Sequence, residues 1–254
     1  RDFKEEERFV FINAWNEWAE GTYLEPDEKY GYANINTVSK ALFNIPFDDS
    51  LLIINNNDII KKDFVFSKRI AVQIHMFYLE TIDETIESIN KIPFDFDCFI
   101  STDTYDKAEK IKALFSSNCK CSNLTVQIFE NRGRDVLPFL LQLKDKIDDY
   151  DFIYHIHSKK TVKTDHGNDW RRYIFKNLLG SSDYIKTLFY YLEKEDGLGM
   201  IFPKTFPPLE YQAQWGGNLS QTQMLLSLLN SDIKVSQNLN FPVGNMFLAK
   251  TEAI

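Results

Sequence analysis

Three polar clusters follow apolar runs in the middle of the sequence, where each could line a binding site at the end of a buried strand. They are Ser101–Asp103, Glu130–Asp135 and His155–Lys160. In an open parallel sheet, ligands bind at the carboxyl ends of the strands. Because the clusters combine cations, amides and hydroxyl groups, we expect them to meet at one edge and to bind an anionic, hydroxylated ligand.

The second cluster contains residue types that recognise phosphate or carboxylate groups. Arg132 and Arg134 carry forked guanidinium donors, and Gly133 allows the backbone to turn tightly or to approach a ligand. Asp135 can cap a following helix, whose N-terminus at the same edge also favours anions. Together with Asn131, these residues are predicted to hold the ligand; a turn containing ion pairs is the alternative.

The third cluster offers two histidines and two lysines. His155 and His157 are two residues apart on an expected strand, so both imidazoles lie on one face. Such a pair can bind the metal of a hydrolase with His166 as third ligand, but histidines hydrogen-bonded to the backbone are the favoured interpretation. Lys159 and Lys160 supply point charges for phosphate, or form an ordinary solvated face.

Strands alternate with helices from residue 69 onward. Apolar runs predict strands, and apolar residues at helical spacing predict helices of about 10–15 residues. The expected strands are 70–76, 94–100, 124–129, 152–157, 198–202 and 245–249, and expected helices lie at 82–89, 108–115 and 136–147. Thr81 and Glu84 have the spacing of a capping box for the first of these helices. The alternation predicts an α/β fold with a mostly parallel sheet and flanking helices.

The first part of the sequence is too small to form a core of its own. It contains one apolar run, 9–12, and one set of helically spaced apolar residues, 35–42. We therefore divide the chain into an opening segment 1–45, a connector 46–68 and a main domain 69–254. Because the sequence starts without Met, we expect it to be a piece of a longer protein.

Composition narrows the class of protein. The 254 residues carry a net charge of −8, which argues against nucleic-acid binding because phosphate contacts require surplus Lys and Arg. The three cysteines make no disulfide framework, and the spacing of Cys119 and Cys121 fits neither a zinc knuckle nor a redox pair, so inert thiols are expected. No apolar run approaches the roughly 18 residues of a membrane helix. We expect a cytoplasmic protein, with the inner face of the cell membrane as an alternative location.

The sequence from residue 69 to the end resembles the rhamnan synthesis protein F family, which occurs in bacterial surface-polysaccharide gene clusters. The resemblance rests on five motifs, which are ENRGRDVLPF at 130–139, YHIHSKK at 154–160, Trp170-Arg171, LGS at 179–181 and FPVGNMF at 241–247. It covers about three quarters of the chain. It implies a glycosyltransferase-like domain associated with rhamnose-containing polysaccharides.

The order of elements is also similar to that of a GT-A glycosyltransferase, which implies a nucleotide held by the first strands and an Asp-x-Asp motif at the end of the fourth. Here His155-Ile156-His157 stands at the position of that motif. Hard divalent cations prefer oxygen ligands, so the usual Mn or Mg site is in doubt and neither a metal nor another cofactor is predicted. The lysines and arginines of the clusters can neutralise a diphosphate instead.

The opening segment resembles the end of the glycosyltransferase WbsX family, which is related to glycoside hydrolase family 99. The resemblance rests on FINAWNEWAEGTYLEP at residues 11–26. In the hydrolases this stretch ends a (β/α)₈ barrel and carries two acid/base carboxylates, whose matching positions here are Glu17 and Glu20. It implies a barrel remnant at 1–45, without activity of its own because most of the barrel is absent; a purely structural role of both glutamates is the alternative.

These observations predict a glycosyltransferase-like enzyme of bacterial surface-polysaccharide biosynthesis, of rhamnan or O-antigen type. Asn131–Asp135 and His155–Lys160 would hold a nucleotide-diphosphate donor of a sugar such as rhamnose, and Trp170 and Arg171 would face the rim or the acceptor. The expected acceptor is a growing or lipid-linked glycan, and the catalytic base is not assigned. The alternative function is a non-catalytic module that binds glycan or nucleotide.

Overall fold

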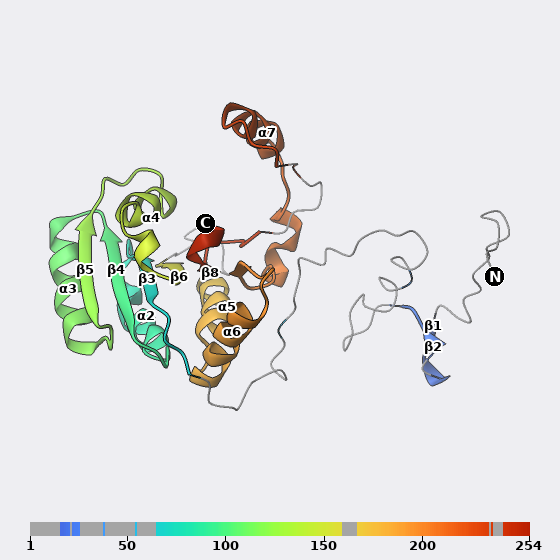
Figure 1. Ribbon diagram of the computed structural model, residues 1–254, viewed down its shortest axis with the longest axis horizontal. Helices are drawn as coiled ribbons and strands as arrows, with labels where there is room; N and C mark the ends of the chain where they lie inside the picture. Colours follow the sequence, from blue (N-terminus) through green and yellow to red (C-terminus); the bar gives the residue numbers. More distant parts are fainter. Residues whose placement is uncertain are drawn as a thin grey trace. The chain divides into compact units, whose positions relative to one another are not determined.

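A computed structural model describes residues 16–20, 22–25, 38, 54, 65–158, 167–233, 235 and 241–254 (Figure 1). The chain divides into two compact units, Arg1–Ile53 and Ile54–Ile254, and each is described by itself. Among the described residues, no helix combines the length and the apolar character that a membrane span requires.

The first unit contains a short antiparallel hairpin. Strand β1 (Asn16–Glu17) pairs with β2 (Thr22–Tyr23), and a 3-10 helix, Trp18–Glu20, lies between them. The Trp18 ring stacks on Tyr23 with centroids 4.2 Å apart, and Trp18 Nε1 donates to Glu25 Oε2 at 2.8 Å. The expected strand at 9–12 and almost all of the expected helix at 35–42 lie outside the described residues, so the barrel remnant stays a prediction.

The second unit is built on a six-stranded sheet of order β5-β4-β3-β6-β8-β7. The strands are β3 (Ile70–His75), β4 (Phe96–Thr102), β5 (Asn123–Ile128), β6 (Phe152–His157), β7 (Met200–Ile201) and β8 (Phe247–Lys250). The first four strands in this order are parallel, whereas β8 is antiparallel to both β6 and β7. The predicted α/β fold with a mostly parallel sheet is confirmed.

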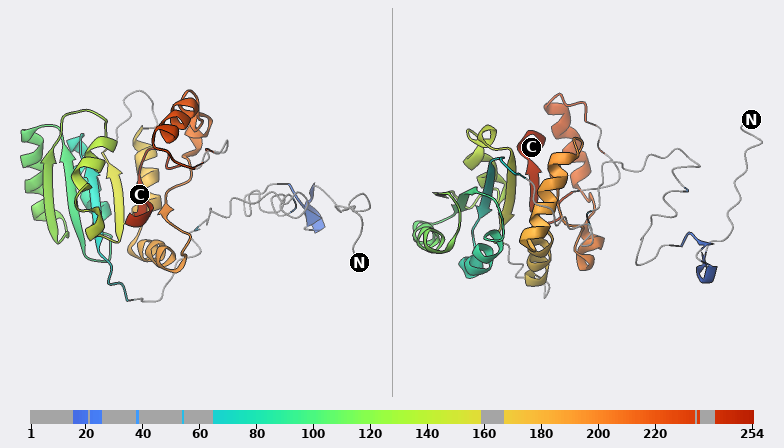
Figure 2. Two further views of the ribbon diagram at one scale, coloured as in Figure 1. Left: turned by 45° about the horizontal axis from the view of Figure 1, so that its top comes forward. Right: turned by 60° about the horizontal axis from the view of Figure 1, so that its bottom comes forward.

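Helices cover both faces of the sheet (Figure 2). The α-helices of this unit are α2 (Ile82–Ile89), α3 (Tyr105–Asn118), α4 (Val136–Leu143), α5 (Gly167–Leu179), α6 (Ser182–Lys194) and α7 (Asn218–Leu228). Shorter 3-10 helices lie at Leu79–Thr81, Ile147–Asp149, Pro207–Gln212 and Thr251–Ala253.

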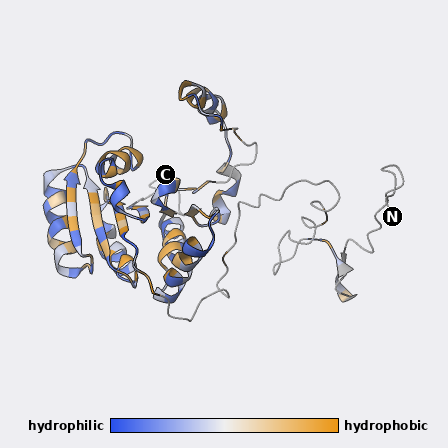
Figure 3. Ribbon diagram, viewed as in Figure 1, coloured by the Kyte–Doolittle hydropathy of each residue, from blue (hydrophilic) through white to orange (hydrophobic). Residues whose placement is uncertain are grey.

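Successive residues of β3 point to opposite faces and so belong to two different cores. Ile70, Val72 and Ile74 join the larger core with residues of α2, α3, α5 and α6, whereas Ala71 joins the smaller core with Phe139 of α4. Figure 3 shows the matching pattern of hydropathy, with hydrophobic colour in the parallel strands and both colours on α3. Polar residues of β3 that point to the same face as Ala71 therefore lie in or beside the smaller core.

Two local predictions are wrong. The capping box does not form, because Thr81 makes no side-chain capping bond and instead donates to the Tyr78 carbonyl at 2.9 Å, while Glu84 pairs with Arg171. The helix expected at 136–147 ends at Leu143, since the Lys144–Ile147 stretch is polar except at its last residue. A tertiary contact of Glu84 therefore disrupts the first pattern, whereas the change from apolar to polar residues ends the second.

The stretch that was expected to be a connector contributes to the larger core. Phe66 stacks on Phe94 with ring centroids 4.1 Å apart and meets the edge of Phe189 at 5.0 Å. It also packs beside Phe152 at 5.9 Å. The main unit therefore includes at least one aromatic residue that precedes residue 69.

Candidate functional site

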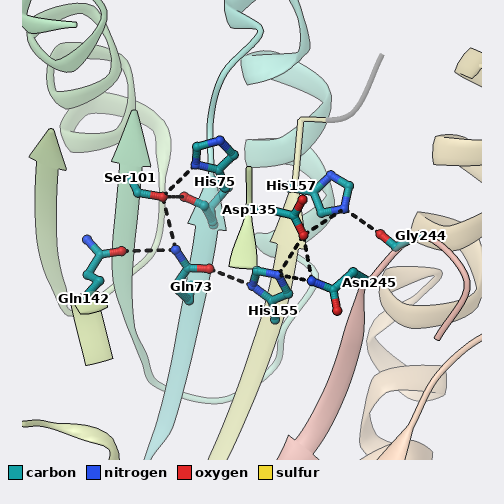
Figure 4. A network of polar contacts seen from close by, with 10 residues as sticks. Gln73, His75, Ser101, Asp135, Gln142, His155, His157, Gly244 and Asn245 are labelled. Atoms are coloured by element: carbon teal, nitrogen blue, oxygen red, sulfur yellow. Dashed lines mark hydrogen bonds and ion pairs between the residues drawn. The ribbon is translucent and has the colours of Figure 1, made fainter. Parts of the chain in front are cut away.

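The carboxyl ends of β3, β4 and β6 place five polar side chains on the α4-facing side of the sheet. These are Gln73, His75, Ser101, His155 and His157 (Figure 4). Strand register aligns Gln73 with His155, and His75 with both Ser101 and His157. All but His75 are buried, so the site begins as a polar layer within the smaller core.

The loop between β5 and α4 folds back over this layer. Gly133 has a φ of 68° and Arg134 a φ of 53°, so two successive residues are left-handed. A Cβ added at Gly133 would collide with Leu137 Cβ, which explains the glycine. The reversal directs Asp135, the next residue, toward the strand ends.

Asp135 is the centre of the site. Its Oδ2 accepts a hydrogen bond from Asn245 Nδ2 at 2.6 Å and lies 3.5 Å from His155 Nε2 and 3.8 Å from His157 Nε2 (Figure 4). Asn245 lies in the turn before β8, where it has a φ of 55°. The prediction that Asp135 caps the helix is wrong for its side chain, which makes no capping bond and instead accepts a hydrogen bond from Asn245.

A chain of amides fixes the proton of His155. Gln142 Nε2 donates to the Ile100 carbonyl at 3.1 Å, so Gln142 Oε1 accepts from Gln73 Nε2 at 3.1 Å. Gln73 Oε1 therefore faces His155 Nδ1 at 2.7 Å and requires a proton there. His155 Nε2 is then the acceptor for Asn245 Nδ2 at 3.3 Å.

The protonation states follow from these contacts. Burial lowers the pKa of His155, which is fully buried, so the ring is neutral at pH 7. Burial would raise the pKa of Asp135, but the charge of His157 and the hydrogen bond from Asn245 outweigh it and bring that pKa below its ordinary value. The site thus holds an ionised carboxylate against a neutral imidazole.

His75 is the most exposed of the three imidazoles in this layer. It is half-buried, and its Nδ1 lies 3.0 Å from Ser101 Oγ. Burial lowers the pKa of His75, while the Asp135 charge opposes that shift. A neutral, partly exposed imidazole near a carboxylate is a group that can accept a proton from a bound hydroxyl.

The second histidine of β6 ties the site to the turn before β8. His157 Nε2 lies 2.6 Å from the Gly244 carbonyl and so donates to it. Gly244 has a φ of 97°, and a Cβ there would lie 2.9 Å from Trp170 Cζ2 and 3.0 Å from Ile174 Cδ1. Trp170 therefore packs against the backbone that positions Asn245.

The structure brings some of the residues predicted from sequence together and leaves others apart. Asp135, His155 and His157 meet, and Trp170 lies behind the Gly244 turn. Arg171 is instead 5% exposed and bound to Glu84 of α2, with its Nη2 2.6 Å from Glu84 Oε2.

The remaining predicted residues are not part of this network as the structure describes it. Asn131, Arg132, Gly133 and Arg134 are exposed on the loop before α4. Lys159, Lys160 and His166 lie outside the described residues. Glu17 and Glu20 lie in β1 and in the following 3-10 helix. The binding roles of these residues stay predictions.

The sequence did not predict four members of the network, namely Gln73, His75, Gln142 and Asn245. Gln73 and His75 alternate with Val72, Ile74 and Met76, so the period of two could have assigned them to one face. Asn245 is 110 residues from Asp135, and no local pattern joins the two.

Two other features of the described residues lie away from this network. A hollow of about 470 Å³ is found at the amino ends of the strands, lined among others by Arg69, Phe94, Asp97 and Tyr150. Within the described ranges, one group of side chains has its potential metal ligands close enough together to share an ion. This group consists of Cys98, Cys119 and Cys121.

Comparison with protein families places the chain in a class. The chain belongs to the rhamnan synthesis protein F family, whose profile matches residues 27–254. The profile of glycosyltransferase WbsX matches residues 1–38. The resemblances of the sequence to these two families are thereby confirmed, and the family descriptions support a link to polysaccharide synthesis. The similarity to GT-A glycosyltransferases stays a prediction.

Two curated relatives extend along nearly the whole chain. They are the proteins named "Uncharacterized protein WxcX" from Xanthomonas campestris pv. campestris strains B100 and ATCC 33913, each 32% identical over 252 residues. The match covers 97% of this chain and 33% of each relative, so the chain spans about a third of their length. No solved structure matches the chain.

Proposed function

We propose that the chain is the transferase part of a protein that assembles a bacterial surface polysaccharide of rhamnan or O-antigen type. It transfers a sugar such as rhamnose from a nucleotide-diphosphate donor to a growing or lipid-linked glycan. Membership of the rhamnan synthesis protein F family and the WbsX match support this class of reaction. We place it in the cytoplasm or at the inner face of the cell membrane.

The observation that carries the proposal is the charged Asp135 at the carboxyl edge of the sheet. The hydrogen bond from Asn245 and a left-handed loop hold its Oδ2 in place beside His155, and the carboxylate remains 17% exposed. A carboxylate fixed at this edge is suited to accept hydroxyl hydrogen bonds from a sugar. The four parallel strands followed by an antiparallel β8 support the proposed GT-A-like arrangement.

The proposed donor contacts come from the loop before α4 and from the two lysines that follow β6 in the sequence. Arg132 and Arg134, with Asn131 and the lysines 159 and 160, bind the diphosphate, because guanidinium and ammonium groups make charge-assisted bonds to phosphate oxygens. His155 is fully buried, so it acts as a positioning residue for Asp135 rather than as a contact to the donor. No metal ligand is assigned to this site.

His75 is the proposed proton acceptor. In the transfer step, the acceptor hydroxyl oxygen bonds to the anomeric carbon as the bond from that carbon to the diphosphate oxygen breaks. The hydroxyl proton passes to the neutral His75 ring, and the diphosphate leaves with the electron pair of the broken bond. The lowered pKa of His75 keeps the ring neutral and able to take this proton at pH 7.

The opening segment has a separate proposed role. Glu17 and Glu20 match acid/base carboxylates of barrel hydrolases, and residues 1–38 match the WbsX profile. We assign both glutamates to a barrel that a longer protein would complete, since the chain spans about a third of the length of its curated relatives. Activity of that barrel is not expected from this chain alone.

The presence of His155-Ile156-His157 at the end of the fourth parallel strand favours a second candidate, a non-catalytic module that binds glycan or nucleotide. A transferase that has lost its metal-binding carboxylates can keep the binding edge and lose turnover. The two candidates share the site and differ in whether sugar is released from the donor.

Calorimetric titration of nucleotide sugars tests the proposal. We expect a dTDP or UDP sugar to bind the whole chain, and Arg134→Ala to weaken binding about tenfold because one charge-assisted contact is lost. Lys112→Ala, an exposed charge on α3, is the matched control and should bind as the wild type does. Release of the nucleoside diphosphate supports the transferase, glycan binding without nucleotide affinity supports the module, and no binding of either kind contradicts both.

A further inference from the structure

Three thiols converge at the amino-terminal half of β4. Cys98 lies in β4, Cys119 follows the last residue of α3, and Cys121 lies in the turn before β5. Their sulfur atoms all lie within 4.8 Å of one another. These are the only cysteines among the 254 residues, so every thiol of the chain belongs to this cluster.

We propose that Cys98, Cys119 and Cys121 bind one thiophilic metal ion, of which Zn²⁺ is the representative, through their three sulfur atoms. Zinc–sulfur bonds of about 2.3 Å place the sulfurs of such a site roughly 4 Å apart. The sulfurs of the metal-free cluster are close enough to reach this spacing by small side-chain rotations. Soft thiolate ligands select zinc or Cu(I) over hard cations.

The backbone holds all three cysteines in place before a metal arrives. Cys98 is fully buried on β4, between its register partners Val72 on β3 and Leu124 on the edge strand β5. The Cys119 amide donates to the Phe115 carbonyl at 2.9 Å. Because the ligands are already positioned, metal binding requires little ordering of the chain.

The residues beside Cys119 and Cys121 are held as well. Lys120, which separates the two cysteines, donates its amide to Asn90 Oδ1 at 2.9 Å, and the Ser122 amide donates to the Phe96 carbonyl at 2.8 Å. When a metal binds, the sulfur atoms can therefore move by rotation of side-chain bonds while the backbone stays in place. The spacing of Cys119 and Cys121 does not indicate this site, because the third ligand, Cys98, is a strand residue more than twenty positions away.

Two of the three thiols of the cluster can be reached from solvent. Cys119 and Cys121 are half-buried, so an ion can enter from solvent and a water molecule can complete its coordination. Binding would then release protons and stabilise the folded chain.

The proposed metal site would link secondary-structure elements to one another and would take no part in sugar transfer. It links β4 to the end of α3 and the start of β5, whereas Asp135 and His75 lie at the carboxyl ends of the strands. The inference is therefore independent of the proposed transferase, and failure of either leaves the other intact.

The test uses the whole chain, reduced and freed of metal, and titrated with Zn²⁺. We expect one zinc per chain, protection of the three thiols from alkylation, and a higher unfolding temperature. Cys119→Ser and Cys121→Ser should each weaken zinc binding by more than the roughly 10–100-fold typical of losing a supporting residue. Ser122→Ala, an exposed neighbour of Cys121, is the matched control and should bind zinc as the wild type does.

The wild-type measurements decide the proposal even if a cysteine variant fails to fold. Alkylation of all three thiols at the same rate with and without Zn²⁺ would overturn it. So would less than one bound zinc per chain at saturation, or equal zinc affinity of the wild type and both folded variants. Formation of a disulfide in a chain that binds no zinc when reduced would assign the cluster to redox chemistry instead.

Discussion

At the scale of single residues, the candidate site depends on one carboxylate that is kept charged by polar groups around it. Asn245 donates a hydrogen bond to Asp135 Oδ2, whereas the His155 ring is neutral and therefore does not form an ion pair with this carboxylate. Hydrogen bonds to the ionised form stabilise it more strongly than they would a neutral acid. The contribution of this negative charge to binding and transfer can therefore be measured with a substitution that removes the charge and keeps the shape of the side chain.

Asp135→Asn should lower sugar transfer about 100-fold, since it removes a charged acceptor at the reacting edge. Binding of the nucleoside diphosphate should stay the same or tighten, because a negative charge beside the phosphates is lost. Steady-state transfer and calorimetry of the two proteins measure this split. Asp145→Asn, an exposed residue beyond α4, is the control, and equal loss of binding and transfer in Asp135→Asn would assign the residue a structural role alone.

Acid should destabilise the folded chain through His155. The unfolded ring takes up a proton below about pH 6.5, whereas the buried ring has a lowered pKa and stays neutral to lower pH. The unfolded state therefore binds more protons in this range, and the free energy of unfolding should fall as pH drops from 7 toward 5. Urea unfolding at both pH values should show a smaller fall in His155→Gln, and equal stability of the wild type at both would contradict the assignment.

At the scale of elements, the loop before α4 depends on a glycine. Gly133→Ala would place a methyl group against Leu137 at a φ of 68°, so we expect a loss of roughly 1–3 kcal/mol in the free energy of unfolding. Gly197→Ala is the matched control, because no atom lies within 4 Å of its added Cβ. Urea unfolding of both variants measures the difference, and equal stability would show that the loop relaxes freely.

The elements themselves could be predicted better than the contacts between them. Strand 152–157 was predicted with its observed bounds, since a run of apolar residues beside polar clusters fixes a buried strand locally. The Thr81–Glu84 capping box failed because Arg171, from a helix 87 residues later, binds Glu84. Likewise, the pairing of Asp135 with Asn245 follows from the antiparallel return of β8 beside β6, which one sequence does not reveal.

At the scale of the whole molecule, the main unit should fold without the opening segment. All members of the two described cores lie between Ile54 and Ile254. A chain of residues 54–254 should therefore unfold at the same urea concentration as the whole chain. A chain of 69–254 lacks Phe66 and should lose roughly 1–3 kcal/mol. Unfolding of 54–254 at a clearly lower urea concentration than the whole chain would show that the first unit supports the second.

The central claim is that the donor binds at the carboxyl edge of the sheet, around Asp135. Hydrogen–deuterium exchange of the whole chain, with and without a saturating nucleotide sugar, tests it most directly because it locates the ligand without a mutation. We predict that the donor slows exchange at 130–135 and 243–246, and leaves 93–97 unchanged. Slower exchange confined to 66–70 and 93–97, around the hollow at the opposite edge, would contradict the account.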